Sequence, residues 1–305
     1  MRLSHHHRDH PASLDRLGDL KHSTRNEHCA ELEKKIRGRA PYPVSYDVLG
    51  GQGTGFTEYA YTEFLTGLWV FSQSVEVNAR LMVELASEDS QVADTLDPLV
   101  EALMDKYVLA PVDDRWKQVK RIVFMPGHNR MDVASVENIT RLLFENDDIM
   151  IKPHPLTNEP GMDTLGRSLG WNRIIPRNIS GMALLQQCDV VYTTSASEMA
   201  ITGTLLGKQV VNVSNFFFEG SGTYHPISRL LFTIHRDHGV SEAQRVLTRL
   251  IAHPASGIIM PWQTDQDDRI DQFFQRSLDL RTRLKPIAAP LAPVRMRGVS
   301  DDKTQ

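Results

Sequence analysis

The sequence predicts an α/β protein, with a parallel sheet in its C-terminal half and a smaller, helix-rich part before it. From residue 120, short apolar runs alternate with amphipathic helical patterns in units of about 20 to 30 residues. This alternation requires crossover connections, which place consecutive strands parallel in one sheet. Before residue 120, the stretches 65–82 and 94–108 carry apolar residues at helical spacing. We therefore expect two structural parts of different character.

The first two strands expected in the second part end in residues that cannot continue them. The first ends in a Pro-Gly pair, and the second leaves through Lys152, Pro153, His154 and Pro155. Proline fixes φ and removes a backbone donor, so the second strand stops there. The expected strands are 121–127, 148–152, 171–176, 189–197 and 208–214, and the expected helices are 135–146, 162–170, 179–188 (opened by Asn178 or Ser180), 198–207, 241–251 and 265–284.

The composition is that of a soluble globular protein, with 305 residues, 41% hydrophobic and 24% charged. A net charge of −4 gives no overall basic field for nucleic acid or membranes. No apolar run approaches the length of a transmembrane helix. We divide the chain into a polar extension (1–40), a helix-rich N-terminal part (41–117), a part with the parallel sheet (118–284) and a disordered tail (285–305).

Cysteine and histidine usage bears on the compartment and on metal binding. Cys29 and Cys188 form no CxxC pattern, so a disulfide is not expected and a cytoplasmic location is the simplest reading. Four histidines near the start could bind a metal ion, but a solvated tail is favoured because nothing there fixes ligand geometry. They are His5, His6, His7 and His10.

Three polar loops follow strands that should end on the same edge of the sheet. In open parallel sheets, ligands bind in the crevice beyond the carboxyl ends of the strands. These loops are therefore the place to look for a binding site. The candidate ligand-binding residues in them are Gly127, Asn129 and Arg130, then Lys152 and His154, then Thr194, Ser195, Ser197 and Glu198.

The residue types in these loops suit a phosphate group. Thr193, Thr194, Ser195 and Ser197 stand where a strand passes into a helix, and hydroxyls and free amides there can hold an anion. A plain helix cap is the simpler explanation, but four hydroxyls exceed what capping needs. His154 with Lys152 could neutralise a diphosphate without a metal.

The ordered set KPHP, TSASE and GTLLGKQVV resembles the nucleotide-binding half of GT-B glycosyltransferases, especially the bacterial capsule, sialyl- and Kdo-transferase groups. The resemblance covers about residues 118–284 and implies a C-terminal Rossmann-like domain. It implies that His154 and the Ser195–Ser197 pair contact donor phosphates and that Glu198 holds the ribose. It further implies a UDP- or CMP-linked sugar as the substrate, no cofactor, and a last helix that packs back toward the N-terminal domain.

Residues 41–117 depart from that family because they are too few for a full second parallel sheet. The acceptor-side domain must be reduced, which leaves the catalytic base open. An inverting transfer needs a group that takes the acceptor proton. Glu58, Glu63 and Asp47 are the candidates, and Glu58 lies nearest a glycine-rich turn at 50–55. A solvated or capping carboxylate is the alternative for each of them. A loop after the fifth strand, 216–232, could close over the donor or simply anchor to the core.

The leading hypothesis is a metal-independent glycosyltransferase acting on a nucleotide sugar. A sugar-nucleotide 2-epimerase or hydrolase of the same fold is the alternative enzyme, and a non-catalytic nucleotide-binding module is the alternative outside enzymes. The acceptor could be a surface-glycan precursor or a hydroxylated base in phage DNA, in which case the compartment is the host cytoplasm. Basic residues at 115–121 and in the last helix keep the DNA acceptor open. Nothing in the sequence indicates an oligomeric state.

Overall fold

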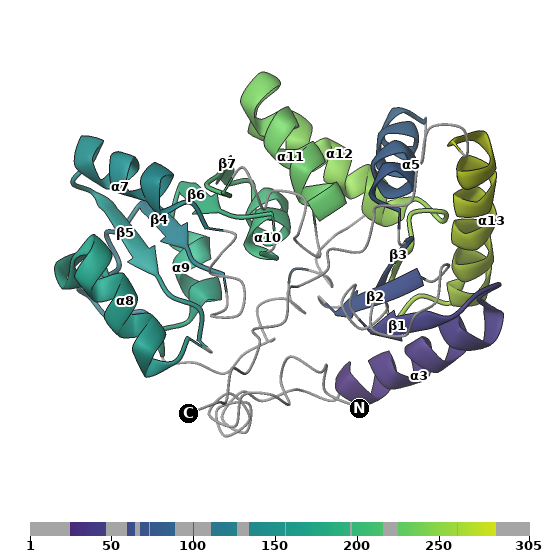
Figure 1. Ribbon diagram of the computed structural model, residues 1–305, viewed down its shortest axis with the longest axis horizontal. Coiled ribbons are helices and arrows are strands. Elements are labelled where there is room, and N and C mark those ends of the chain that lie inside the picture. The colour runs from purple at the N-terminus through teal and green to yellow at the C-terminus, as the bar shows by residue number, and fades with distance from the viewer. Residues whose placement is uncertain are drawn as a thin grey trace, which may run out of the picture.

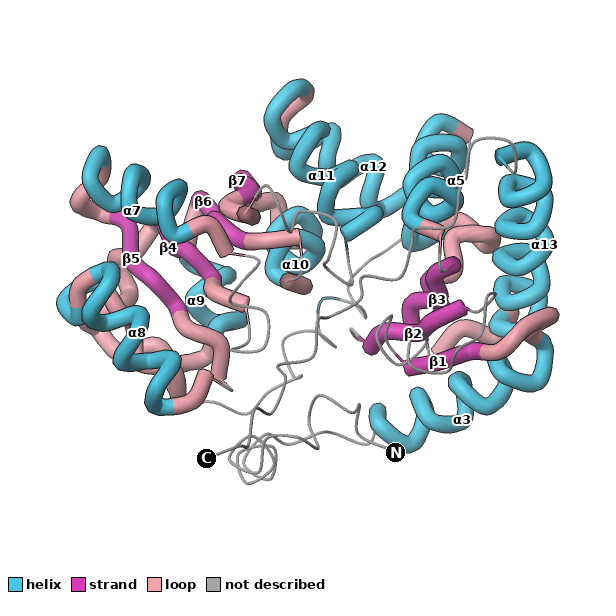
Figure 2. The backbone as a smooth tube through the Cα atoms, viewed as in Figure 1, coloured by secondary structure: helices cyan, strands magenta, loops and turns pink. Residues whose placement is uncertain are grey.

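The computed structural model describes residues 25–46, 60–64, 68–72, 74–88, 100, 111–126, 134–155, 157–195, 197–215, 225–260 and 262–284. Within these ranges the chain forms two four-stranded sheets with helices packed around them (Figures 1 and 2). The predicted α/β class is therefore confirmed.

The second half of the chain contains the predicted parallel sheet. Its strands run in the order β5-β4-β6-β7, and each neighbouring pair is parallel. The chain goes from the central strand β4 to β5 on one side and then crosses to β6 on the other. The strand order therefore reverses between β4 and β6, which is the position where open α/β sheets bind ligands. The bounds are Arg121–Phe124 for β4, Ile149–Lys152 for β5, Val190–Thr193 for β6 and Gln209–Asn212 for β7.

Helices cover both faces of this sheet because the side chains of β4 alternate between two cores. Ile122 and Phe124 belong to a core with α9, whereas Val123 and Met125 belong to a core with α7. Figure 1 shows α7, α8 and α9 around the sheet. The helices are α7 (Val136–Glu145), α8 (Glu159–Leu169), α9 (Gly181–Gln187) and α10 (Met199–Leu205).

The helix boundaries follow the capping residues. Ser135 accepts a hydrogen bond from the Asn138 amide and starts α7, and Asn158 starts α8 in the same way. Ser180, and not Asn178, caps α9, which decides between the two predicted starts. Gly170 closes α8 with a φ of 91°, a conformation that glycine adopts without strain.

The predicted strand 171–176 is reduced to a single bridge. Trp171–Arg173 form a 3₁₀ turn, η2, and only Ile174 pairs with Ile151 in a parallel bridge. The Ile175 amide adds one hydrogen bond of 2.8 Å to the Ile151 carbonyl oxygen. Pro176 then ends the pairing because it has no amide to donate.

The first half contains a sheet where a helix was predicted. The order is β1-β2-β3-β8, with β3 antiparallel to both neighbours. The helix predicted over 65–82 is wrong for Leu68–Ser72 and right only from Val75. The aromatic and branched residues of β3 favour a strand. Its partner β8 comes from far along the chain, so the helical spacing of the local apolar residues gave the wrong prediction. The strands are β1 (Val44–Tyr46), β2 (Ala60–Phe64), β3 (Leu68–Ser72) and β8 (Ile258–Ile259).

The helices at the chain's two ends pack on this first sheet. Within the polar extension 1–40, Leu32 and Ile36 of α3 are buried in the first core. That core also takes residues of α5, α10, α11, α12 and α13, so the predicted unit 118–284 contributes to both halves. The helices are α3 (Arg25–Arg39), α5 (Val75–Ser87), α11 (His225–Asp237), α12 (Val240–Ala252) and α13 (Gln266–Leu284).

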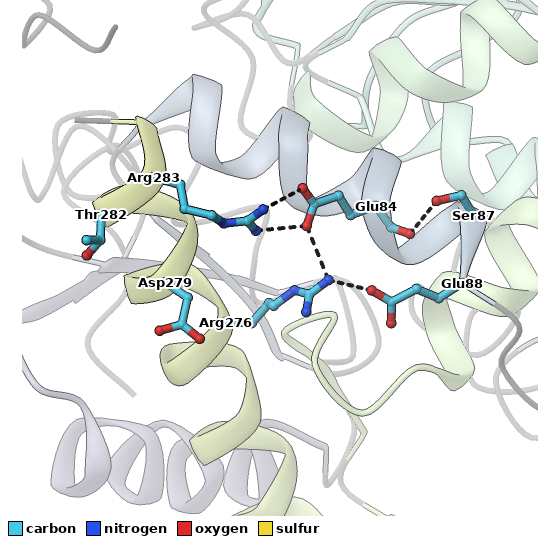
Figure 3. Close-up of a pocket in the computed structure, with 7 residues that line it drawn as sticks. All are labelled: Glu84, Ser87, Glu88, Arg276, Asp279, Thr282 and Arg283. Atoms are coloured by element: carbon cyan, nitrogen blue, oxygen red, sulfur yellow. Dashed lines mark hydrogen bonds and ion pairs between the residues drawn. The ribbon is translucent and has the colours of Figure 1, made fainter. Parts of the chain in front are cut away.

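The last helix packs back onto the N-terminal half, as the resemblance implied. α13 contacts α5, α3 and β8. Figure 3 shows Arg276 and Arg283 of α13 reaching Glu84 of α5, with Arg276 also bound to Glu88 at 2.5 Å. These ion pairs line an open cavity of about 670 Å³ between the two helices.

Several predictions concern residues outside the described ranges. They include the histidines at 5–10, Cys29's side chain, most of the expected helix 94–108, the loop 216–224 and the tail 285–305. Among the helices that the structure describes, none has both the length and the apolar character needed to cross a membrane.

Candidate functional site

The candidate site lies at the carboxyl edge of the parallel sheet, where β4, β5 and β6 end side by side. Phe124 pairs with Lys152 in the β4–β5 register, and Val123 pairs with Tyr192 in the β4–β6 register. Thr193 donates its hydroxyl to the Phe124 carbonyl oxygen at 3.4 Å, which ties the ends of β4 and β6 together. The loops after β5 and β6 therefore begin on the same edge of the sheet, on either side of β4.

Lys152 ends β5 as a buried side chain with 2% exposure. Its ammonium donates to the carbonyl oxygens of Pro153 at 2.7 Å and Arg177 at 3.0 Å. Burial lowers the pKa of Lys152 to about 7, and no carboxylate pairs with it among the described residues. The proposed phosphate contact of Lys152 stays a prediction, while these contacts give the side chain a structural task.

Arg177 fastens the loop that holds His154. Its guanidinium donates to the Thr157 carbonyl oxygen at 2.8 Å and to the carboxylate of Glu159, while its own carbonyl receives Lys152. The Thr157 amide donates to the His154 carbonyl oxygen at 2.9 Å, which closes a tight turn containing Pro155. The half-buried His154 is thus held in a turn fixed from both ends.

Sequence reasoning overlooked Arg177. Its contacts are between residues about 20 positions apart, so no local pattern indicates them. One signal was present, since a basic residue follows the expected strand 171–176 on the same edge of the sheet. The single bridge between Ile151 and Ile174 brings this residue beside the His154 turn.

The hydroxyl cluster after β6 divides into members with structural partners and one without. The Thr193 hydroxyl binds β4, and the Ser197 hydroxyl accepts a hydrogen bond at 3.2 Å from the amide of Met199, the first residue of α10. The Ser195 amide donates to the hydroxyl of Ser214 at 3.0 Å. Thr194 is fully buried, and its hydroxyl has no hydrogen-bond partner among the described residues.

An unsatisfied buried hydroxyl costs free energy, about 1 to 3 kcal/mol, so it calls for an explanation. Thr194 lies directly after β6, at the strand-order reversal. A bound oxygen-rich ligand at this edge would supply the missing acceptor. The hydroxyl of Thr194 is therefore the strongest single sign of a ligand in the described part of the chain.

Glu198 occupies the N-cap position of α10, and its side chain makes no capping hydrogen bond. Its carbonyl oxygen accepts from the Thr202 hydroxyl at 3.2 Å. The side chain is half-buried and follows the hydroxyl cluster directly. The expected contact of this carboxylate with a ribose stays a prediction.

Among the remaining candidates, Glu63 alone lies within the described ranges. Gly127, Asn129 and Arg130 lie outside the described ranges, as do Asp47 and Glu58. Glu63 lies in β2 of the first sheet, opposite Trp69, and its side chain is not described. Within the described residues, no group of three or more His, Cys, Asp or Glu side chains is arranged to hold a metal ion.

Comparison with known proteins gives little further guidance. No family model and no curated protein sequence matches the chain. Among solved structures, Staphylococcus aureus MnaA bound to UDP matches 60% of this chain and 53% of its own, with 17% identity and a TM-score of 0.28. A Listeria monocytogenes protein assigned as a UDP-N-acetylglucosamine 2-epimerase matches 71% and 53%, with 12% identity and a TM-score of 0.27. The chain thus spans about half the length of each, and scores this low establish neither a shared fold nor a shared function.

Proposed function

We propose that this chain binds a nucleotide-sugar donor at the carboxyl edge of the parallel sheet and transfers the sugar to an acceptor hydroxyl without a metal. The single observation that carries the proposal is the buried Thr194 hydroxyl, which has no partner among the described residues and follows β6 on the sheet edge that also carries the His154 turn. Both lie next to the strand-order reversal of the sheet. The donor is expected to carry UDP or CMP.

In this proposal the described residues bind and orient, and the reacting carbons lie beyond them. His154 and Thr194 donate hydrogen bonds to the phosphate oxygens of the donor, whose charge grows as the bond to the sugar breaks. Glu198 accepts from the ribose hydroxyls. Arg177 and Lys152 keep the His154 turn in place. The proton of the acceptor goes to a carboxylate of the N-terminal part, for which Glu58, Glu63 and Asp47 remain the candidates.

The experiment compares two threonines that the structure places in opposite situations. The Thr194 hydroxyl has no described partner, whereas the Thr204 hydroxyl donates to Ala200 at 2.7 Å and contacts His235 at 2.8 Å. Thr194→Val should leave stability unchanged or raised and weaken UDP or CMP binding about three- to tenfold. Thr204→Val should lower stability by about 1 kcal/mol and leave nucleotide binding unchanged.

The measurement is a thermal-shift and calorimetric titration of wild type and both variants with UDP, CMP and their sugar conjugates. His154→Ala should weaken the binding of the same nucleotide, and His238→Ala, at an exposed position, serves as its control. Wild type that binds none of these ligands refutes the proposal. If the sugar is epimerised or released without an acceptor, the chain is an epimerase or a hydrolase, not a transferase.

A further inference from the structure

A second buried hydroxyl, that of Ser228 in α11, has no hydrogen-bond partner among the described residues. Ser228 is fully buried. A hydroxyl inside a helix often bonds to a backbone carbonyl of the preceding turn, as the Thr233 hydroxyl does with the Arg229 carbonyl oxygen at 3.0 Å. Ser228 makes no such bond, so its hydroxyl carries an uncompensated cost of burial, as the Thr194 hydroxyl does.

The spacing along α11 shows which side Ser228 faces. His235 comes two helical turns after Ser228, so the two side chains lie on the same side of the helix. The Nε2 atom of His235 lies 2.8 Å from the Thr204 hydroxyl oxygen of α10. Ser228 therefore lies on the side of α11 that faces α10 and the parallel sheet, and not on the solvent side.

The first turns of α11 lie toward the carboxyl edge of the parallel sheet. α11 contacts β7 and α10, and the three lie together in Figure 1. Thr204 lies at the end of α10, just before the turn that leads into the start of β7, so its contact with His235 sets the later part of α11 beside that start. Residues 229–236 of α11 and 209–212 of β7 line one cavity, which shows that the helix runs along the strand. The earlier turn with Ser228 thus lies toward the end of β7.

The end of β7 is joined to the loop that carries Thr194. The Ser195 amide donates to the Ser214 hydroxyl at 3.0 Å, and the Ser214 amide donates to the side-chain oxygen of Asn212 at 2.8 Å. Asn212 is the last residue of β7. The Thr194 and Ser228 hydroxyls therefore lie on the same edge of the sheet, one after β6 and the other beside the end of β7.

The start of α11 also favours a negative charge. The first amides of a helix have no partner within it, and the helix dipole places a partial positive charge there. α11 has 13 residues and no acidic residue in its first turn, so no carboxylate of that turn compensates this charge. An anion with several oxygen acceptors suits both the helix start and the hydroxyl of Ser228.

We propose that the Ser228 hydroxyl and the first turn of α11 bind the second phosphate of a diphosphate-linked donor, while Thr194 binds the first. This inference rests on the proposed function, which leaves UDP and CMP open. The two hydroxyls come from different elements, beside strands that lie about 4.8 Å apart, and two phosphate groups in succession fit this arrangement. The donor is therefore of the UDP type, with two phosphates, and not of the CMP type, with one.

The experiment compares nucleoside diphosphates with monophosphates. UDP is paired with UMP, and CDP with CMP, so that the base stays constant within each pair. Each is titrated calorimetrically against the full chain. The wild type should bind one diphosphate at least about tenfold more tightly than the matching monophosphate. Ser228→Ala should reduce this ratio to about threefold or less, by weakening the diphosphate and leaving the monophosphate unchanged.

Ser277→Ala is the matched control. The Ser277 hydroxyl is also buried without a partner among the described residues, but it belongs to α13, which packs on the first sheet. Each change removes a hydroxyl that makes no described hydrogen bond, so the melting temperature without ligand should not fall in either variant. The ratio of diphosphate to monophosphate affinity should change for Ser228→Ala and stay at the wild-type value for Ser277→Ala.

Several results would overturn this inference alone and leave the donor site in place. They are a wild type that binds both members of a pair equally, and a Ser228→Ala variant that keeps the wild-type ratio. Equal weakening of both members by Ser228→Ala is another, because the two hydroxyls would then hold one phosphate. A lower melting temperature of ligand-free Ser228→Ala also contradicts it, since the hydroxyl would then have a partner in the chain. A wild type that binds none of the four nucleotides removes the proposed function itself, and the assignment of Ser228 with it.

Discussion

At the scale of single residues, Lys152 is the most unusual group in the described chain. Its ammonium is enclosed at 2% exposure and binds two carbonyl oxygens, from Pro153 and Arg177, instead of a carboxylate. Burial removes water from the charge and lowers the pKa of Lys152 from 10.5 to about 7. The two carbonyl contacts favour the charged form and oppose this shift. Lys152 therefore links the His154 turn to the segment before α9, and the free energy of burying its ammonium depends on pH.

Lys152→Met should reveal that cost. Between pH 7 and 10.5 the unfolded chain holds a proton on Lys152 that the folded chain has lost, so the wild-type free energy of unfolding rises with pH. The methionine variant has no such group. The free energy of unfolding of the wild type minus that of the variant should therefore increase by up to about 2 kcal/mol from pH 7 to pH 9.

Urea unfolding at several pH values gives this difference. Lys120→Met is the control, because Lys120 also donates to a backbone carbonyl, that of Gln187 at 3.1 Å, but at the surface. The stability difference for this control should stay level over the same range. A level difference for Lys152→Met as well would mean that Lys152 keeps its proton throughout and that its carbonyl contacts outweigh burial.

At the scale of elements, the turn before β8 decides whether the first sheet forms. Gly257 has a φ of +77°, and a Cβ built there would lie 2.6 Å from the Val70 carbonyl oxygen and 2.7 Å from the Phe273 ring. The Gly257 carbonyl oxygen also accepts from the Val70 amide at 2.8 Å. Only glycine allows both the left-handed backbone and this close approach.

Gly257→Ala should lower the free energy of unfolding by about 3 kcal/mol, because steric overlap adds to backbone strain. Gly239 provides a matched control, with a φ of +84° and open space around its Cβ position. Gly239→Ala should cost about 1 kcal/mol, the strain alone. Denaturant unfolding of both variants measures the two values, and equal losses would show that β3 shifts to relieve the contact.

Elements whose signals are local were predictable from the sequence. The strands β4 to β7 and the helices α7, α8 and α9 appear close to their predicted positions, because apolar runs, prolines and caps such as Ser135 and Gly170 mark them. β3 was not predictable, since its partners β2 and β8 lie on both sides in sequence and Leu68–Ser72 also fit a helical spacing. The packing of α3 was not predictable for the same reason, because its partner α13 lies about 230 residues away in the sequence.

The candidate site shows the same division. The parallel-strand rule placed His154 and Thr194 on one edge from sequence alone. The Lys152–Arg177 contact required the Ile151–Ile174 bridge, and nothing local announces it. The unpartnered state of the Thr194 hydroxyl likewise depends on everything packed around it.

At the scale of the whole molecule, α10 and α13 connect parts that are distant in sequence. Within α10, Ala200 belongs to the core of the parallel sheet, whereas Ile201 and Leu205 belong to the core of the first sheet. Figure 1 shows α10 between the parallel sheet and helices α11 and α12. A helix shared by two cores couples their packing, so we expect the described parts to unfold together.

The ion pairs between α5 and α13 fasten the C-terminal helix to the first half, and Glu84 is their centre. Its carboxylate binds Arg80 at 2.8 Å, Arg283 at 3.1 Å and Arg276 at 3.2 Å, and its side chain is 15% exposed. Burial alone would raise the pKa of Glu84, but the hydrogen bonds from Arg283 and Arg80 outweigh it and lower the pKa. The folded chain therefore favours the charged carboxylate.

Glu84→Gln should lower the free energy of unfolding by about 1 to 2 kcal/mol at pH 7, because three arginines lose one shared partner. The loss should vanish as the pH falls below the ordinary range of a carboxyl group, where wild-type Glu84 also becomes neutral, and it should shrink at high salt.

Asp279→Asn is the control. Asp279 lines the same cavity, but among the described residues its carboxylate binds Gln275 alone, at 3.1 Å, and in Figure 3 it points away from the ion pairs. Its replacement should change stability by less than about 0.5 kcal/mol. Equal losses for both variants, or a Glu84→Gln loss that persists at low pH, would show that α13 is held by its apolar face, through Phe273 and Phe274, and not by these charges.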